Sequence, residues 1–368
     1  MQKNTIQIVA FNNPYPANFG GAIDMFYKIE ALSKLGVCIH LHIFCDDRLE
    51  VTGLESLCEK IHLYKRKKSL LMHFSFKPYT ILSRDSVSLV ASLKSIHAPI
   101  FFESLRSCQA LMNTEFSQKI GVRNHNIEHH YSWGLAKSES HWVKKLAHYV
   151  EGFKQKRSEK LLNKADVLFN ISNEEHDYFS KLYKPKSIFL PVFHGYENIV
   201  TKSQFGKYAL YHGDLSTADN IKSARFLIDV FKDIAYPLII ASSTMNKKLL
   251  TLIDSHKNIS FQSIGSEQQL LRLIGNAHIN TLYSFQKSGT KLKVFTALFN
   301  GRHCILNKNM VDDSNLLKVC EIAETKDDYQ KEVRTLINEE FVLTEERKKA
   351  LSKYSNIENA KIIVKNLL

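Results

Sequence analysis

The chain has 368 residues, of which 44% are hydrophobic and 24% are charged, and this is enough apolar material for two ordinary domains. Its six cysteines form no CxxC pair or regular spacing, which argues against a disulfide framework or a zinc site and favours a reducing cytoplasm. The N-terminus lacks the apolar core of a signal peptide, and no run approaches 18 apolar residues, so no membrane-spanning helix is predicted. The net charge of +13 favours an anionic partner, although a lysine-rich composition explains the total equally well.

Short apolar runs alternate with helical patterns along the whole chain. Most runs are almost continuously apolar, which is typical of parallel strands that are covered on both faces. The strands predicted in the first half are 6–12, 38–45, 60–65, 99–105, 119–125 and 166–172. Those predicted in the second half are 207–213, 236–243, 258–264, 278–285, 303–307 and 319–325. Helical segments separate most of them, so the sequence predicts an α/β fold with two doubly wound, Rossmann-like domains and parallel sheets.

A linker is predicted over residues 183–206, because two prolines and two glycines interrupt the helical pattern there. We expect a first domain over 1–190 and a second over 200–354, with the boundary between about 186 and 206. The amphipathic segment at about 355–368 could pack on either domain. Because ligands bind at the carboxyl ends of strands in open α/β sheets, a cleft between the carboxyl ends of the two sheets is the expected site.

The first candidate binding stretch is the loop that follows the first strand. It ends in Gly20 and Gly21, where an amphipathic helix begins. Paired glycines let a ligand approach the backbone N–H groups, and the helix dipole favours a negative group there. The stretch matches neither GxGxxG nor a phosphate loop, and a flexible strand-to-helix loop is the alternative.

The second stretch crowds polar side chains at the end of the strand 119–125. These side chains belong to Arg123, His125, Asn126, Glu128, His129 and His130, and a basic amphipathic helix is predicted at about 140–163. The spacing differs from the HExxH zinc motif, so no metal is predicted. A histidine in a cleft suits proton transfer or hydrogen bonding to sugar hydroxyls, although a surface position explains His130 equally well.

Two more stretches lie in the second half. Gly213 follows a predicted strand and leads through a polar loop to Asn220 and a helix. The other is the stretch 288–301, "SGTKLKVFTALFNG", where Gly289 and Thr290 precede a helix start with Lys291 and Lys293. Two lysines at the positive end of a helix are unfavourable without an anion, so this stretch is predicted to cradle a diphosphate. A basic helix start without a ligand is the alternative.

Taken together and in this order, the four stretches resemble glycosyltransferases of the GT-B fold, in particular family 4, over nearly the whole chain. The resemblance is carried by Pro14, Pro16, Gly20 and Gly21; by His125–Glu128; by Ala165, Asp166, Ile171 and Ser172; by Gly213–Ser216 with Asn220; and by 288–306.

The resemblance implies transfer of a sugar from a nucleotide diphosphate sugar to an acceptor hydroxyl, without a metal or other cofactor, in synthesis of a bacterial surface glycan or glycoconjugate. The second domain would hold the nucleotide, and the first would mostly hold the acceptor. On this resemblance, Lys293 and Lys291 would contact the diphosphate, and Gly289, Thr290, Gly20 and Gly21 would lie beside it. The backbone of Ser263 and Ile264 would contact the base, and His125 would lie at the donor sugar. Gly213 is a further implied donor-binding residue. Asp24 could contact the acceptor, and an inverting enzyme would need Asp24, His125 or Glu128 as its base.

The chain departs from the family pattern in its donor site. Many members carry two glutamates eight positions apart around the Gly-Thr-Lys loop, where this chain has Ser288 and Thr296. The usual basic residue after the glycine of the second-domain loop is Asp214 here. Donor contacts must therefore differ, and a retaining outcome rests on the resemblance alone. A non-catalytic nucleotide- or sugar-binding relative in a glycan-assembly complex is the alternative.

A cluster of positive charge lies in the stretch 64–74, where four basic residues adjoin an apolar patch. Nothing in the sequence resembles a nucleic-acid-binding motif, so no nucleic-acid partner is predicted. With the basic helix 140–163, the stretch suits an anionic membrane surface that carries a lipid-linked acceptor. We therefore expect a cytoplasmic protein, peripheral on the membrane, that binds anionic vesicles and is released by salt.

Overall fold

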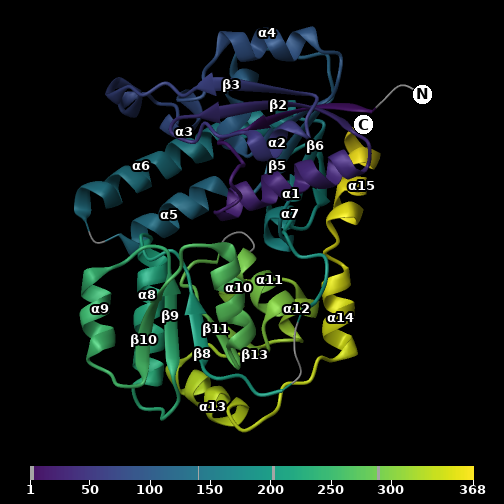
Figure 1. Ribbon diagram of the computed structural model, residues 1–368. Coiled ribbons are helices and arrows are strands. Elements are labelled where there is room, and N and C mark those ends of the chain that lie inside the picture. Colours follow the sequence, from purple (N-terminus) through teal and green to yellow (C-terminus); the bar gives the residue numbers. More distant parts are fainter. Residues whose placement is uncertain (1–3, 140, 201–203, 288–290) are drawn as a thin grey trace. The chain divides into compact units, whose positions relative to one another are not determined.

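The computed structural model describes residues 4–139, 141–200, 204–287 and 291–368. The chain divides into two compact units (Figure 1). The first unit is Met1–Gly195 with Tyr354–Leu368, and the second is Tyr196–Lys353. Each unit has its own parallel sheet with helices on both faces, so the predicted pair of doubly wound, Rossmann-like domains is confirmed.

The first unit is built on a seven-stranded sheet in the order β3-β2-β1-β4-β5-β6-β7. Its strands are β1 (Thr5–Ala10), β2 (Cys38–Cys45), β3 (Lys60–Lys65), β4 (Ile100–Glu103), β5 (Ile120–Asn124), β6 (Val167–Asn170) and β7 (Lys186–Phe189). All neighbouring pairs are parallel. The central strand β1 shows why these runs are continuously apolar: Ile8 packs in the core on one face and Val9 in the core on the other, and both are fully buried.

Helices cover both faces of this sheet. The α-helices are α1 (Gly20–Lys34), α2 (Thr52–Glu55), α3 (Tyr79–Leu82), α4 (Val87–Ser95), α5 (Glu128–Ser138), α6 (Trp142–Ser158), α7 (Asn173–Leu182) and α15 (Asn356–Leu367). The 3-10 helices are η1 (Leu70–Phe74), η2 (Leu105–Met112) and η3 (Glu159–Lys164). The last helix, α15, follows the second unit along the chain but packs against α1 and buries Ala360, Ile363 and Leu367 in the first core (Figure 1).

The second unit is built on a six-stranded sheet in the order β10-β9-β8-β11-β12-β13. Its strands are β8 (Ala209–His212), β9 (Leu238–Ser242), β10 (Ile259–Ser263), β11 (Ile279–Leu282), β12 (His303–Leu306) and β13 (Glu321–Ile322). Its helices are α8 (Ala218–Phe231), α9 (Lys247–Asp254), α10 (Glu267–Asn276), α11 (Leu292–Asn300), η4 (Lys308–Met310), α12 (Ser314–Leu317), α13 (Lys326–Leu336) and α14 (Glu345–Ser352). The strand order turns around at β8, so the loops after β8 and β11 diverge at the carboxyl edge of the sheet and leave room for a ligand there.

Two elements differ from the sequence-based predictions. Strand β7 lies inside the stretch predicted to be a linker, because it is a short edge strand between Pro185 and Pro191 and is only partly buried. The region after β5 holds two helices, α5 and α6, and η3 tightens the end of the second. His129 and His130 therefore lie on a helix. Among the described residues, none of the helices combines the length and the apolar content needed to cross a bilayer.

Candidate functional site

The second unit places Lys293 beside the loop that follows β8. Lys293 lies in the first turn of α11, and its Nζ donates a hydrogen bond of 3.0 Å to Asn220 Oδ1. The same ammonium lies 5.1 Å from the centre of the buried Tyr211 ring. These contacts bring together Gly213 and Lys293, two of the predicted donor-binding residues, because a Cβ at Gly213 would lie only 3.2 Å from Nζ. The glycine therefore leaves room for the ammonium.

Lys293 forms no ion pair with a carboxylate of the described residues. In the described part of the chain, no carboxylate oxygen lies within 4.0 Å of Nζ. Burial and nearby Lys291 lower the pKa of Lys293 to about 8, and Asp219 partly opposes both effects. Burial and the Lys293 charge also lower the pKa of His212 to about 3, so His212 is neutral at pH 7. The site thus concentrates positive charge where an anion would be favoured.

The loop that faces Lys293 is held rigidly by its own side chains. Asn220 Nδ2 donates to the backbone oxygen of Asp214 at 2.9 Å, and Tyr211 Oη donates to both oxygens of Asn220. Asp214 accepts from the Thr244 hydroxyl at 2.7 Å and from Ser216. Asp214 therefore serves as a loop-closing group at the position where the family has a basic residue.

A second set of hydrogen bonds joins α8 to the loop after β11. Asp219, in the first turn of α8, accepts from Ser284 Oγ at 2.8 Å and from the backbone N–H of Phe285 at 3.0 Å. Ser284 and Phe285 are thereby anchored to the first turn of α8, which follows the Gly213 loop. Three predicted site residues, Ser288, Gly289 and Thr290, lie outside the described residues. Lys291 is the residue that precedes α11.

The remaining predicted donor contacts lie on two other elements. Ser263 ends β10 and is exposed, and the backbone N–H of Ile264 is bonded to Ser242. Thr296 lies one turn after Lys293. Its hydroxyl donates to the backbone oxygen of Leu292 and accepts from Tyr196 at 3.1 Å. The hydroxyl at this position is thus engaged inside the second unit.

The first unit has a very different polar cluster at the carboxyl ends of β4 and β5. Asp24 of α1 accepts from Arg123 at 2.8 and 3.2 Å and from Lys28 at 3.0 Å, and Lys28 also pairs with Glu103 at 2.8 Å. All four side chains are fully or almost fully buried. Burial alone would raise the pKa of Asp24, but Arg123, Lys28 and His125 hold that pKa well below its usual range. A carboxylate that already accepts hydrogen bonds from Arg123 and Lys28 is a weak base, so the arrangement favours a structural role for Asp24.

His125 is the member of this cluster that reaches the surface. Its side chain is 10% exposed, its Nε2 lies 3.0 Å from Glu103 Oε2, and its Nδ1 lies 3.9 Å from Asp24. The edge of its ring meets Phe11. Asp24, Glu103 and His125 offer three potential metal ligands within 4.8 Å of one another. The ammonium of Lys28 already touches both carboxylates, however, and its charge disfavours a cation at this position.

The other predicted residues of the first unit are also tied into the fold. Glu128 accepts from Ser104 at 2.6 Å and forms a two-pronged pair with Arg106 at 2.7 and 2.9 Å. Gly20 and Gly21 begin α1, which no side chain of the described residues caps. A Cβ at Gly21 would lie 2.9 Å from the Phe11 ring, so glycine is also needed there for packing.

Several contributing residues were not predicted as site residues. Glu103 and Lys28 in the first unit, and Asn220, Asp219 and Ser284 in the second, organise the predicted ones. The sequence carries one indication that Glu103 is a site residue, because its carboxylate comes directly after the apolar residues of β4. The partners of Asp219 carried no such signal.

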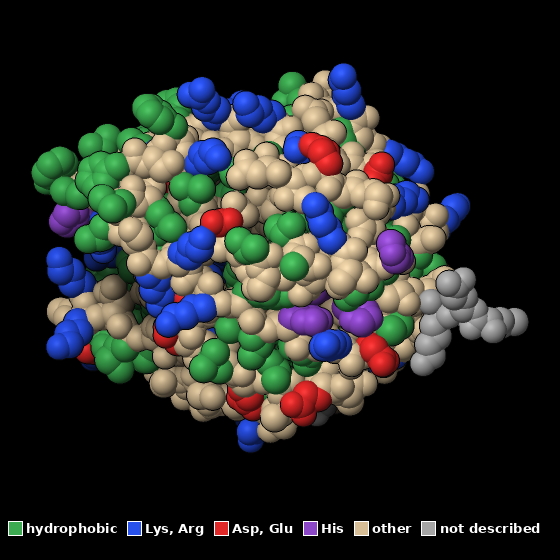
Figure 2. Space-filling model, turned by 90° about the horizontal axis from the view of Figure 1, so that it is seen from above, with side chains coloured by type: hydrophobic (Ala, Val, Ile, Leu, Met, Phe, Trp, Pro, Cys, Tyr) green, Lys and Arg blue, Asp and Glu red, His purple; other side chains and the backbone are tan. Residues whose placement is uncertain are grey.

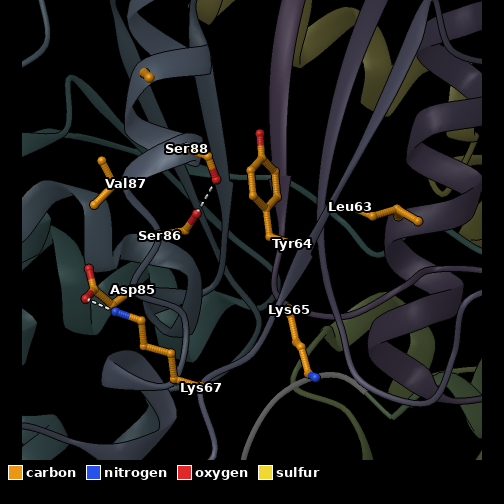
Figure 3. Close-up of a pocket in the computed structure, with 9 residues that line it drawn as sticks. Leu63, Tyr64, Lys65, Lys67, Asp85, Ser86, Val87 and Ser88 are labelled. Atoms are coloured by element: carbon orange, nitrogen blue, oxygen red, sulfur yellow. Dashed lines mark hydrogen bonds and ion pairs between the residues drawn. The ribbon is translucent and has the colours of Figure 1, made fainter.

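A separate hollow of about 680 Å³ lies between β3 and α4 (Figure 3). It is lined by Leu63, Tyr64, Lys65, Lys67, Asp85, Ser86, Val87, Ser88 and Ala91. Lys67 pairs with Asp85 at 2.6 Å, and Ser86 bonds with Ser88 at 3.0 Å. None of the predicted site residues lines it, so we do not assign the donor or acceptor to this hollow.

Comparison with known proteins shows what the chain resembles. No protein-family profile matches the sequence. A Klebsiella pneumoniae protein described as an uncharacterized 44.6 kDa protein in the cps region is 25% identical over 331 residues, which are 84% of this chain and 78% of that protein.

Solved structures match the whole chain at low sequence identity. The apo form of the lipopolysaccharide outer core galactosyltransferase WaaB has a TM-score of 0.68 and 13% identity, over 99% of this chain and 100% of that one. An S. aureus TarM mutant in complex with fondaparinux, alpha-GlcNAc-glycerol and UDP has a TM-score of 0.67 and 12% identity. Anabaena HepE in complex with UDP and glucose has the same two values. Each of the latter two covers 99% of both chains. The predicted GT-B fold is therefore confirmed.

Proposed function

We propose that the protein is a glycosyltransferase that moves a sugar from a nucleotide diphosphate sugar to an acceptor hydroxyl in bacterial surface polysaccharide synthesis. The observation that carries the proposal is the ammonium of Lys293 in the first turn of α11, which lies beside Gly213 and forms no ion pair with a carboxylate of the described residues. Two solved structures of the same fold are complexes with UDP, and the sequence relative belongs to a cps region. These similarities support the proposed substrate class.

The proposed role of Lys293 is to stabilise charge on the leaving diphosphate. As the bond to the sugar breaks, negative charge grows on the diphosphate oxygens, and a fixed cation at the positive end of a helix stabilises the transition state more than the ground state. Lys291, which precedes α11, would add to this positive charge. The reaction proposed here is independent of metal ions and retains the anomeric configuration.

His125 is the proposed group at the donor sugar. Glu103 holds its Nε2, so the ring orientation is fixed by a fully buried carboxylate. The acceptor is proposed to be a glycan or a lipid-linked sugar, and an anionic membrane surface is its proposed setting.

The test is a titration of the purified protein with UDP, GDP, CMP and their sugar conjugates, followed by thermal unfolding. A ligand at about 100 times its Kd adds roughly 2.7 kcal/mol, which is a shift of several degrees for domains of this size. We expect one nucleotide to stabilise the protein and Lys293→Ala to lose the effect. Lys331→Ala, which removes an exposed lysine on α13, is the matched control. No shift with any nucleotide would contradict the proposal.

A second function is a non-catalytic nucleotide- or sugar-binding subunit of a glycan-assembly complex. It is favoured by Ser288 and Thr296 at the two glutamate positions and by the engagement of the Thr296 hydroxyl with Tyr196. Binding of a nucleotide without hydrolysis or transfer of its sugar to any acceptor extract would support this function over the first.

A further inference from the structure

The first unit exposes an unusual number of large apolar side chains in two neighbouring segments. In and after η1, the side chains of Leu70, Leu71, Phe74 and Phe76 are 80–85% exposed. On α6, the side chains of Trp142, Leu146 and Phe153 are 55–73% exposed, and Val150 lies between them. We name these eight residues the apolar surface. Isolated exposed apolar residues are ordinary, but a contiguous group marks an interaction site.

Hydrogen bonds show that the two segments adjoin. Lys154 Nζ of α6 donates to the backbone oxygen of His73 in η1 at 2.7 Å. Glu151 of α6 accepts from the backbone N–H groups of Tyr79 and Thr80, just beyond Phe76. The apolar surface is therefore one face of the first unit. Figure 2 shows hydrophobic side chains gathered along one edge of the molecule, with Lys and Arg side chains beside them.

The apolar face of α6 is exposed, whereas an ordinary surface helix turns its apolar face toward the core. Its residues Trp142, Leu146, Val150 and Phe153 follow the spacing of one helical face, and this face points to solvent. The face toward α5 instead carries Gly152, where a Cβ would lie 2.4 Å from the Trp133 ring, and buried Gln155. Burial of the apolar face within this unit therefore does not explain its composition.

Positive charge predominates around the apolar surface, although Asp46 pairs with Arg66 and Lys68 and Asp85 pairs with Lys67. Between residues 64 and 77 there are five basic residues and no acidic one. Within α6, the basic residues are Lys144, Lys145, Lys154, Lys156 and Arg157, and the one acidic residue is Glu151. The carboxylate of Glu151 is occupied by Tyr79 and Thr80 of its own unit. Positive charge beside exposed apolar side chains complements an anionic bilayer, since apolar groups can enter the acyl boundary while lysines meet the headgroups.

We propose that the apolar surface of η1 and α6 inserts into the interfacial layer of an anionic membrane and anchors the first unit there. The sequence predicts docking that raised salt abolishes, and the exposed apolar side chains change that expectation. Electrostatic attraction is screened by salt, whereas burial of apolar groups is not. Binding should therefore weaken but persist when the salt concentration is raised. The proposal does not depend on the function proposed above, because it requires neither a nucleotide nor transfer.

The test uses the full chain and vesicles of phosphatidylcholine with or without phosphatidylglycerol, with bound protein measured by flotation. We expect binding only to the anionic vesicles. The variant Leu70→Ser/Leu71→Ser/Phe74→Ser/Phe76→Ser should lose roughly tenfold or more in apparent affinity at low salt. Because all four side chains are exposed, its thermal unfolding should match that of the parent. The matched control, Met245→Ser/Val342→Ser, removes two side chains of the second unit that are each 64% exposed and should bind normally.

Trp142 supplies an internal reporter, since the chain has two tryptophans and the other, Trp133, donates toward the Tyr149 backbone oxygen. Insertion should shift the emission to shorter wavelength on vesicle binding, and Trp142→Phe should abolish the shift. Equal binding of the quadruple variant and the parent would overturn the proposal, as would equal binding to both vesicle types. Concentration-dependent dimers that the quadruple variant loses, without vesicle binding by the parent, would show a second copy as the occupant and would also overturn it.

Discussion

Lys28 and Lys293 are both shielded lysines near the carboxyl ends of a parallel sheet, but their surroundings are opposite. Lys28 contacts the carboxylates of Asp24 and Glu103 at 3.0 and 2.8 Å and is fully buried. Lys293 contacts an amide oxygen, and its depressed pKa, about 8, reflects burial and another lysine. The first cluster is complete within its unit, whereas the second has charge available for a ligand. The comparison teaches that charge balance, more than residue type, separates a structural lysine from a binding one.

The largest expected effect comes from removing the structural lysine. Lys28→Met leaves two buried carboxylates with one cation fewer, and we expect a loss of about 3–5 kcal/mol in the free energy of unfolding. Lys293→Met removes a charge that lacks a carboxylate partner, so we expect a change within about 1 kcal/mol. Urea unfolding at neutral pH measures both. Similar losses in the two variants would contradict the comparison, and Lys28→Met/Glu103→Gln should recover part of the first loss.

The pH dependence of nucleotide binding tests whether the charge on Lys293 contributes to binding. Its pKa is about 8 in the free protein, and a bound diphosphate would raise it. Binding above pH 8 therefore requires proton uptake, so Kd should rise up to about tenfold per pH unit there and be insensitive to this group well below pH 8. Calorimetric titration between about pH 7 and pH 9 measures the trend, which should vanish in Lys293→Met. A Kd constant over this range in the parent would show that the Lys293 charge does not contribute.

The smallest effect is expected from the group that positions Lys293. Asn220→Ala removes the acceptor of the Lys293 hydrogen bond and the bond to Asp214. We expect nucleotide affinity to fall by about 1 kcal/mol, or roughly fivefold. Asn258→Ala is the matched control, because Asn258 bonds backbone oxygens of Phe231 and Ile234 near the start of β10. It should lower stability without changing Kd, and equal losses of affinity in the two variants would argue against a positioning role.

Much of the fold could be predicted because its strands are buried on both faces. The run 38–45 coincides with β2, which is mostly buried. The run 60–65 coincides with β3, although β3 is an edge strand and only Tyr64 in it is buried. The edge strand β7 could not be predicted in this way. It is only four residues long and lies between Pro185 and Pro191, which favoured a linker at this place.

The site was less predictable because its partners are distant in the sequence. Asp24 resembled an acceptor contact or a base, but its partner Arg123 is 99 residues away, and only the fold shows that the pair is buried. Gly213 and Lys293 were identified separately, and their proximity depends on β8 and β11 being neighbours. Residue type indicated which side chains matter, and topology decided what they do.

The return of α15 to the first unit has a consequence for biosynthesis. The side chains of Ala360, Ile363 and Leu367 pack in the same core as Ile6 and Ile8, so the first unit is sealed by a helix that follows the second unit in the sequence. Synthesis runs from the N-terminus, and a ribosome must finish the whole second unit before that helix exists. The domain made first is therefore the domain completed last, and its apolar face on α1 needs protection during translation.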